Sequence, residues 1–193
     1  GDGGTVAIDP DNSSVLYGEY VYLEIVRSKD GGASKAVPID RTEGQAWGIG
    51  QLLDSRSANT ALFIAPFILD PNNSNTMLAG GASLWRSPDV RSAWYWPSWS
   101  AIKAPFYPGG IVTPELVSAI AVAPGNSDVI WVGHQAGGLF KTSNGTAAHP
   151  LWTAVTSPTL PARYVTRIVF DPNSPQVVYV TYGGFSPNNV WKT

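Results

Sequence analysis

Short apolar runs alternate with turns rich in Pro, Asn and Gly along the whole chain. One phrase recurs four times: an apolar run, then Asp-Pro or Ala-Pro, then a turn with Asn, then a second apolar run. The copies begin at Val6, Phe67, Ile120 and Ile168. Proline ends a strand because it has no N–H to donate, and Asn or Asp closes a turn by accepting a bond from nearby backbone. Each copy therefore predicts the first hairpin of a repeated unit.

The spacing of these phrases predicts the architecture. Their prolines stand at positions 10, 71, 124 and 172, which gives periods of 61, 53 and 48 residues. Such periods are typical of a four-stranded β-propeller blade with loop insertions. We expect an all-β chain forming a partial propeller of about four blades, at residues 5–45, 62–104, 117–157 and 164–193, with an insertion at 46–61. The sequence stops at Thr193, so we expect the last blade to lack its outer strand.

A third apolar run in each unit ends in a basic residue followed by a hydroxyl residue, as in Arg27-Ser28 and Lys141-Thr142. In three units a turn with Asp or Asn follows. These turns resemble the Asp-box, Ser/Thr-x-Asp-x-Gly-x-Thr-Trp, of the bacterial neuraminidase repeat propellers. The matching positions are Ser28, Asp30 and Gly32; Ser87 and Asp89, with Trp94 at the tryptophan position; and Thr142, Asn144 and Gly145, with Trp152 displaced along the chain.

The resemblance implies that the box residues stabilise the fold rather than carry out chemistry. A short carboxylate or amide accepts bonds from the turn, glycine adopts positive φ, and tryptophan packs on the neighbouring blade. The group includes sialidases, xyloglucan-degrading glycoside hydrolases and sortilin-type receptors, so the resemblance also implies a secreted or cell-surface protein. All three boxes are degenerate, and they specify the fold more firmly than any ligand.

Composition excludes several other classes of protein. The chain has 193 residues and a formal net charge of -2, and its 12 Lys and Arg residues are scattered, so no basic stripe for nucleic acid is present. The longest apolar run, residues 61–69, contains Pro66 and is too short to span a bilayer. Cysteine is absent, which excludes disulfides and thiolate metal sites.

Glycoside hydrolysis requires two carboxyl groups that flank a sugar bond. Asp9, Asp70 and Asp171 occupy repeat turns, and repetition explains them. The acids outside the repeat that could be catalytic are Glu43, Asp54 and Glu115, which lie in the long segments between units. They are weak candidates.

Aromatic and cationic side chains offer a different kind of site. Trp94, Tyr95, Trp96 and Trp99 form the densest aromatic stretch, which could stack on a sugar or anchor a protein, although one of these tryptophans is expected to pack between blades. Arg163 and Arg167 are the only plausible arginine pair for a carboxylate, and no complete sialidase set is visible.

The sequence predicts no cofactor and no metal site. His134 and His149 have no partner at metal-ligand spacing, so a structural or surface role is favoured for them. Ca²⁺ could sit at residues 9–12, whose oxygens suit a hard cation, but the same residues suffice for a turn.

Three functions stay open. The first is a non-catalytic module that binds glycan or protein. The second is a fragment of a glycoside hydrolase whose active site is shared with other blades, and the third is a purely structural array. An open propeller exposes unpaired edges, so we expect further blades of a longer chain, or edge pairing with another copy, as partners.

Overall fold

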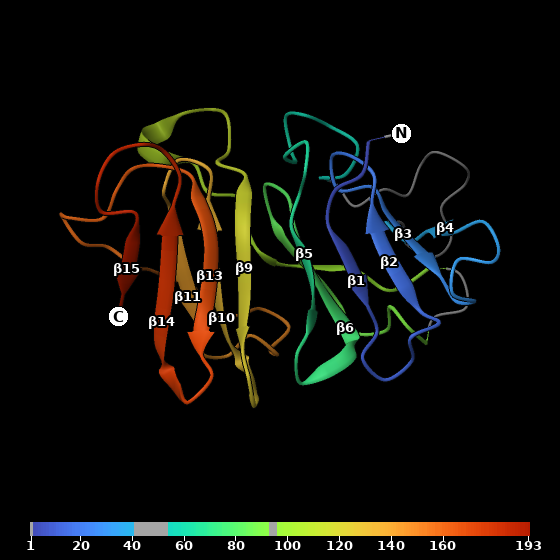
Figure 1. Cartoon of the computed structure of the whole chain (residues 1–193). Helices are drawn as coiled ribbons and strands as arrows, with labels where there is room; N and C mark the ends of the chain where they lie inside the picture. The colour runs from blue at the N-terminus through green and yellow to red at the C-terminus, as the bar shows by residue number, and fades with distance from the viewer. Residues whose placement is uncertain (1, 41–53, 93–95) are drawn as a thin grey trace.

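The computed structural model describes residues 2–40, 54–92 and 96–193, and there the fold is all-β (Figure 1). Fifteen strands form four antiparallel sheets in which strands follow one another in chain order. The first sheet contains β1 (Val6–Ile8), β2 (Leu16–Glu19), β3 (Ile25–Ser28) and β4 (Val37–Pro38). The second contains β5 (Phe67–Asp70), β6 (Asn73–Gly80), β7 (Leu84–Ser87) and β8 (Ser100–Lys103).

The other two sheets repeat this order. The third contains β9 (Val117–Ala123), β10 (Asn126–His134), β11 (Leu139–Thr142) and β12 (Thr153–Ala154), after a single 3₁₀ turn, η1 (Pro108–Gly110). The fourth contains β13 (Val165–Asp171), β14 (Ser174–Tyr182) and β15 (Val190–Lys192), with no fourth strand among the described residues. The prediction of an all-β partial propeller with a last blade of three strands is confirmed.

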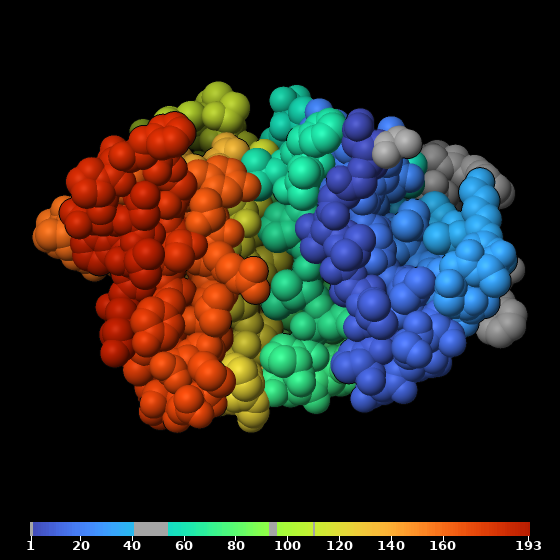
Figure 2. Space-filling view, viewed as in Figure 1, coloured from blue at the N-terminus to red at the C-terminus, as the bar shows by residue number. Residues whose placement is uncertain are grey.

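The sheets stand side by side as blades, with β9 next to β13 on one side and close to β5 on the other (Figure 1). The space-filling view shows one continuous body, with the first blade (residues 6–38) at one end and the fourth (165–192) at the other (Figure 2). The predicted insertion at 46–61 is described only from Asp54 onward. No helix in the described ranges is long and apolar enough to cross a membrane.

Glycines at the end of the second strand let neighbouring blades approach closely. A Cβ added to Gly80 would lie 2.5 Å from Cγ1 of Val117 in the third blade, and one added to Gly133 would lie 2.4 Å from Cγ1 of Val165 in the fourth. Both valines are fully buried on the first strand of the next blade. The repeated glycine is therefore a packing requirement at each of these two junctions.

The apolar core is divided into layers between blades. Tyr17, Ile25, Met77 and Trp85 belong to the layer between the first two blades. Leu78 and Val132 belong to the second layer. The third layer lies between the last two blades and includes the following buried residues: Ala121, Trp131, Leu139, Phe170, Val178 and Val180.

The outer faces of the two end blades keep apolar side chains in solvent. Val6 is 76% exposed and Ile8 is also exposed on β1, and Val190 is 69% exposed on β15. Interior blades cover the corresponding side chains, for example Ile120 on β9 and Leu139 on β11.

Candidate functional site

The three box turns share one hydrogen-bond pattern. The hydroxyls of Ser28, Ser87 and Thr142 donate to Asp30, Asp89 and Asn144 at 2.8, 2.9 and 2.8 Å. The backbone N–H of each acceptor residue returns a bond to the hydroxyl. These residues brace a turn and point to no ligand.

Glycine has a distinct role in two of the boxes. Gly32, whose φ is 85°, donates to the Ser28 hydroxyl at 2.9 Å in the first turn. Gly145 packs closely against Ile130, and a Cβ added to Gly145 would lie 2.4 Å from Cδ1 of that side chain. Hydrogen bonds from Ser34 and Ser28 lower the pKa of Asp30 to about 2, so this carboxylate stays ionised.

The structure places the box tryptophan of the second unit at Trp99. The Asp89 carboxylate accepts a bond from the N–H of Ser98, directly before Trp99, at 2.8 Å. In the third unit Asn144 accepts from Leu151, directly before Trp152, at 2.9 Å. Trp94, which fits the linear motif, lies outside the described residues, as does Tyr95. Extra residues between the box acid or amide and the tryptophan move the tryptophan along the sequence. The hydrogen bond from the residue before the tryptophan to the box side chain is still made, because it depends on how the chain folds and not on a fixed number of residues.

The arginine before each of the first two boxes reaches the box turn of the next blade. Arg27 donates to the carbonyl oxygen of Val90, and Arg86 donates to those of Gly145 and Ala147, the latter at 3.0 Å. The long arginine stems are thus used to join blades.

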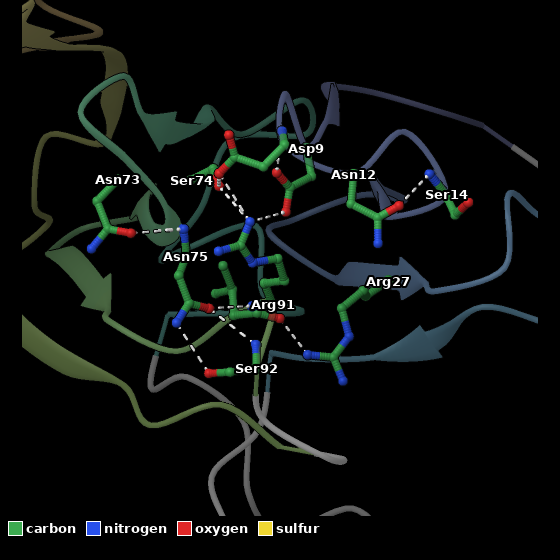
Figure 3. Close-up of polar contacts among 11 residues, drawn as sticks. Asp9, Asn12, Ser14, Arg27, Asn73, Ser74, Asn75, Arg91 and Ser92 are labelled. Atoms are coloured by element: carbon green, nitrogen blue, oxygen red, sulfur yellow. Dashed lines mark hydrogen bonds and ion pairs between the residues drawn. The ribbon is translucent and has the colours of Figure 1, made fainter.

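A polar junction joins the turns of the first two blades (Figure 3). The Arg91 guanidinium donates to Asp9 at 3.4 Å, to Asp11 at 3.0 Å and to Ser74 at 3.1 Å. The Ser74 hydroxyl donates to Asp11 at 2.7 Å. The hydrogen bond from Ser74 lowers the pKa of the Asp11 carboxyl most, and the hydrogen bond from Arg91 lowers it further.

This junction includes residues 9–12, whose oxygens would suit Ca²⁺ but also suffice for a turn. A guanidinium already supplies the positive charge beside Asp9 and Asp11. Among the described residues no group of three or more His, Asp or Glu is arranged to hold a metal ion.

The candidate catalytic acids have structural partners. Asp54 is buried, and its Oδ2 accepts bonds from the N–H of Ser83 and from Nε1 of Trp85, both at 2.7 Å. Glu115 is buried, and its Oε2 accepts a bond from the N–H of Gly138 at 3.4 Å. Glu43 lies outside the described residues.

The predicted binding residues do not gather into one described surface. Trp99 is only 8% exposed and packs between the first two blades, whereas Trp96 is 39% exposed. Arg163 donates to the carbonyl oxygens of Ser186 and Pro187 at 3.4 and 3.1 Å, which ties down that loop. Arg167 is exposed on β13.

A pocket that the sequence did not reveal lies between the second and third blades. Its volume is about 430 Å³, within the usual range for small-ligand sites. Aromatic side chains of Phe106, Phe140 and Trp152 contribute to its wall, with His149 exposed nearby. The other lining residues are Ala101, Ile102, Lys103, Ala104, Pro105 and Pro150. These residues come from β8, β11 and two loops, so no local motif could have found them.

One buried amine lines this pocket. Lys103 is 5% exposed, its Nζ lies 4.2 Å from the centre of the Phe140 ring, and it donates to the carbonyl oxygen of Ala104 at 3.3 Å. Burial lowers the pKa of Lys103 to about 8, and the charge of Glu115 opposes the shift only partly. A fraction of this amine is therefore neutral near neutral pH.

His134 packs against two aromatic residues of the pocket wall, Phe106 and Phe140. It is fully buried, and burial, with a contribution from the charge of Lys103, lowers its pKa to about 3. The neutral ring donates through Nδ1 to the carbonyl oxygen of Glu115 at 2.9 Å. It also makes edge contacts with Phe106 and Phe140, at 5.7 and 5.5 Å between ring centres. His134 therefore has the structural role that the sequence favoured.

Comparison with protein families and with curated proteins finds no match to this sequence. Comparison with solved structures finds β-propellers. An ancestral GH74 enzyme matches all of this chain with a TM-score of 0.66 at 17% identity, over 23% of its own length. The GH74 xyloglucanase from Xanthomonas campestris matches 97% of the chain with a TM-score of 0.64 at 13% identity, over 27% of its length.

A third similar structure is an auxiliary nutrient-binding protein from Bacteroides thetaiotaomicron. It matches 94% of the chain with a TM-score of 0.58 at 12% identity, over 36% of its length. The chain thus spans about a quarter of the GH74 structures and about a third of the nutrient-binding one. At these identities the likeness shows the propeller fold alone.

Proposed function

We propose that this chain is a non-catalytic propeller module that binds carbohydrate outside the cell. The observation that carries this proposal is the pocket between the second and third blades, with three aromatic side chains and one buried amine in its wall. Aromatic rings present an apolar surface that suits the C–H face of a sugar, and a few polar groups fix its orientation. The GH74 structures, one of them a xyloglucanase, are the reason to test a glycan first.

The pocket allows a direct test with one residue of its wall. Phe106 is partly buried, and Phe106→Leu removes an aromatic face while keeping an apolar side chain. We expect the chain to bind oligosaccharides on a glycan array that includes xyloglucan fragments, and Phe106→Leu to weaken that binding about tenfold or more.

The control is Phe185→Leu, because Phe185 is fully exposed and far from the pocket in sequence. It should bind like the unmodified chain. An array on which the folded chain binds no glycan would overturn the proposal, and so would equal binding by the two variants.

A glycoside hydrolase fragment is the second candidate, favoured by the GH74 structures. Against it, Asp54 and Glu115 are buried and bonded to backbone and indole groups. Assays for reducing ends released from xyloglucan, with Glu43→Gln, Asp54→Asn and Glu115→Gln, separate the two. Hydrolysis that one of these substitutions abolishes would establish the enzyme and overturn the binding-only proposal.

The exposed apolar faces of the end blades are consistent with the partners expected from the sequence, further blades of a longer chain or a second copy. Apolar side chains in solvent on β1 and β15 suit packing against further blades of a longer chain or against a second copy. Sedimentation analysis of the 193-residue chain distinguishes these: a concentration-dependent dimer favours the second copy, and a monomer favours further blades.

A further inference from the structure

The pocket between the second and third blades has basic side chains in its wall and no acidic one. Among the described residues that line it, only Lys103 and His149 are ionisable. The rest of this lining consists of Ala, Ile, Pro, Phe and Trp side chains. These side chains include no carboxylate, amide or hydroxyl that could accept a hydrogen bond from a ligand. The side-chain chemistry of the wall therefore suits a ligand that accepts hydrogen bonds and carries negative charge.

The amine of Lys103 has donors to spare. Lys103 is the last residue of β8 and is nearly buried. Its Nζ donates to the carbonyl oxygen of the adjacent Ala104 at 3.3 Å and lies 4.2 Å from the centre of the Phe140 ring. A lysine ammonium has three N–H donors, and the bond to Ala104 uses one of them. The amine can therefore donate to a molecule in the pocket.

The protein does not supply a carboxylate partner for this buried cation. In the part of the chain that the structure describes, the ion pairs involve Arg56 and Arg91 and not Lys103. Glu115 acts on Lys103 through its charge, but it is not part of the described lining, and its Oε2 accepts a bond from the N–H of Gly138. A buried charge is unfavourable unless it is paired. An anion in the pocket would stabilise the protonated amine.

We infer that this pocket binds an acidic sugar, a hexuronic acid whose carboxylate pairs with the Lys103 amine while its ring stacks on the aromatic wall. The inference rests on the proposed glycan-binding function and narrows the ligand to carbohydrate that carries a carboxylate. Phe106, Phe140 and Trp152 offer the apolar surface for the sugar ring. The pairing of opposite charges is strengthened where water is excluded, as it is around this amine. A neutral sugar can use the aromatic wall but gains nothing from the charge.

The test compares two trisaccharides that differ only in charge at each ring. One is α-1,4-linked tri-galacturonate, and the other is α-1,4-linked galactotriose, in which a hydroxymethyl group replaces each carboxylate. Calorimetric titration into the 193-residue chain at pH 7 should show that tri-galacturonate binds at least about tenfold more tightly. Equal binding of the two would overturn this inference and leave the glycan proposal standing. Binding of neither would overturn the inference, and the glycan array would then decide the proposed function.

Two lysine variants locate the preference for the carboxylate. Lys103→Met removes the amine and keeps an apolar stem, so it should bind the two trisaccharides equally. Lys141→Met removes the same charge from an exposed position next to Phe140 on β11, and it should keep the preference of the unmodified chain. Thermal unfolding verifies that both variants are folded. A preference for tri-galacturonate that survives in folded Lys103→Met would overturn the inference.

A separate variant tests whether both sugars use the same pocket. Phe106→Leu removes part of the aromatic wall without changing its charge. It should weaken the binding of tri-galacturonate and of galactotriose by similar factors, so that the ratio between them is kept. Unchanged binding of tri-galacturonate by Phe106→Leu would place the acidic sugar elsewhere and overturn the inference.

The preference should also depend on pH. Burial lowers the pKa of Lys103 to about 8, so the free amine loses its proton as pH rises through that value. A carboxylate binds the protonated amine, and the preference should therefore hold between pH 7 and about 8 and decline toward pH 10. Binding of galactotriose should not change over this range.

Other titratable groups surround the amine and need a control. Glu115 and His134 interact with Lys103 from outside the described lining, and His149 lies within it. His149→Gln should show the same decline of the preference between pH 8 and pH 10. A preference that is constant from pH 7 to pH 10, or a decline that His149→Gln abolishes, would overturn the assignment to Lys103.

Discussion

Nε1 of Trp99 donates a hydrogen bond to the carbonyl oxygen of Ile39 at 2.7 Å, across 60 positions of the sequence. The indole is nearly buried, so neither partner has water as an alternative. Trp99 stands five residues beyond the position that the linear motif assigns to tryptophan. The bond shows how a box turn in one blade can secure the outer strand of another.

Trp99→Phe should destabilise the chain by about 1–3 kcal/mol, because it leaves the buried Ile39 carbonyl without a donor while keeping most of the apolar volume. Urea unfolding followed by circular dichroism measures the change. Phe185→Leu is the control for loss of aromatic area on the surface. A Trp99→Phe midpoint equal to that of the control would show that the bond contributes nothing.

Gly133→Ala should destabilise the chain by about 1–3 kcal/mol, because the new methyl group would overlap Val165 and force two blades apart. Gly3→Ala serves as the control, since nothing lies within 4 Å of the Cβ that it would add. Differential scanning calorimetry of both variants gives the comparison. Equal midpoints would mean that the blades separate at no measurable cost.

Lys103→Met should change how stability depends on pH. The pKa of Lys103 is lowered to about 8 in the folded chain, from 10.5 ordinarily, so the unfolded chain binds more protons between these values. The buried charge therefore destabilises the fold fully below about pH 8, and the penalty disappears as pH rises toward 10.5. The Met variant lacks this penalty and should be more stable at pH 7, by up to about 3 kcal/mol.

Chemical denaturation of Lys103→Met and the unmodified chain at several pH values between 7 and 10.5 measures this effect. The difference between the two should stay constant up to about pH 8 and then shrink toward pH 10.5. Lys141→Met, at an exposed lysine that follows Phe140, is the matched control. A constant difference across the range would contradict an unfavourable buried charge at Lys103.

Arg91→Ala should lower the denaturation midpoint, because it removes the link between the turns of the first two blades. The pKa of Asp11 is lowered by Ser74 and Arg91, so this stabilisation is present above the ordinary pKa of 3.8 and is lost as pH falls through the lowered value. The effect should shrink in high salt, since Asp11 is exposed. A shift in the denaturation midpoint that is the same at high and low salt and at neutral and acid pH would contradict an electrostatic link.

The box turns were predictable from sequence because each is local. Ser28, Asp30 and Gly32 lie within five residues, and their hydrogen bonds follow from that spacing. The position of Trp99 was not predictable, because the turn tolerates an insertion between the acid and the indole. The aromatic pocket was invisible for a related reason: Phe106, Phe140 and Trp152 are distant in sequence and meet only when blades pack.

The sequence by itself determined the repeat, the all-β class and the order of strands within each blade, because strand and turn preferences act over a few residues. Only the tertiary structure decided which tryptophans join blades, that Asp54 is bonded to Trp85, and that Lys103 is buried beside a pocket. These features depend on the packing of one blade on the next. The residues next to a side chain in the sequence do not determine which residue of another blade it will contact.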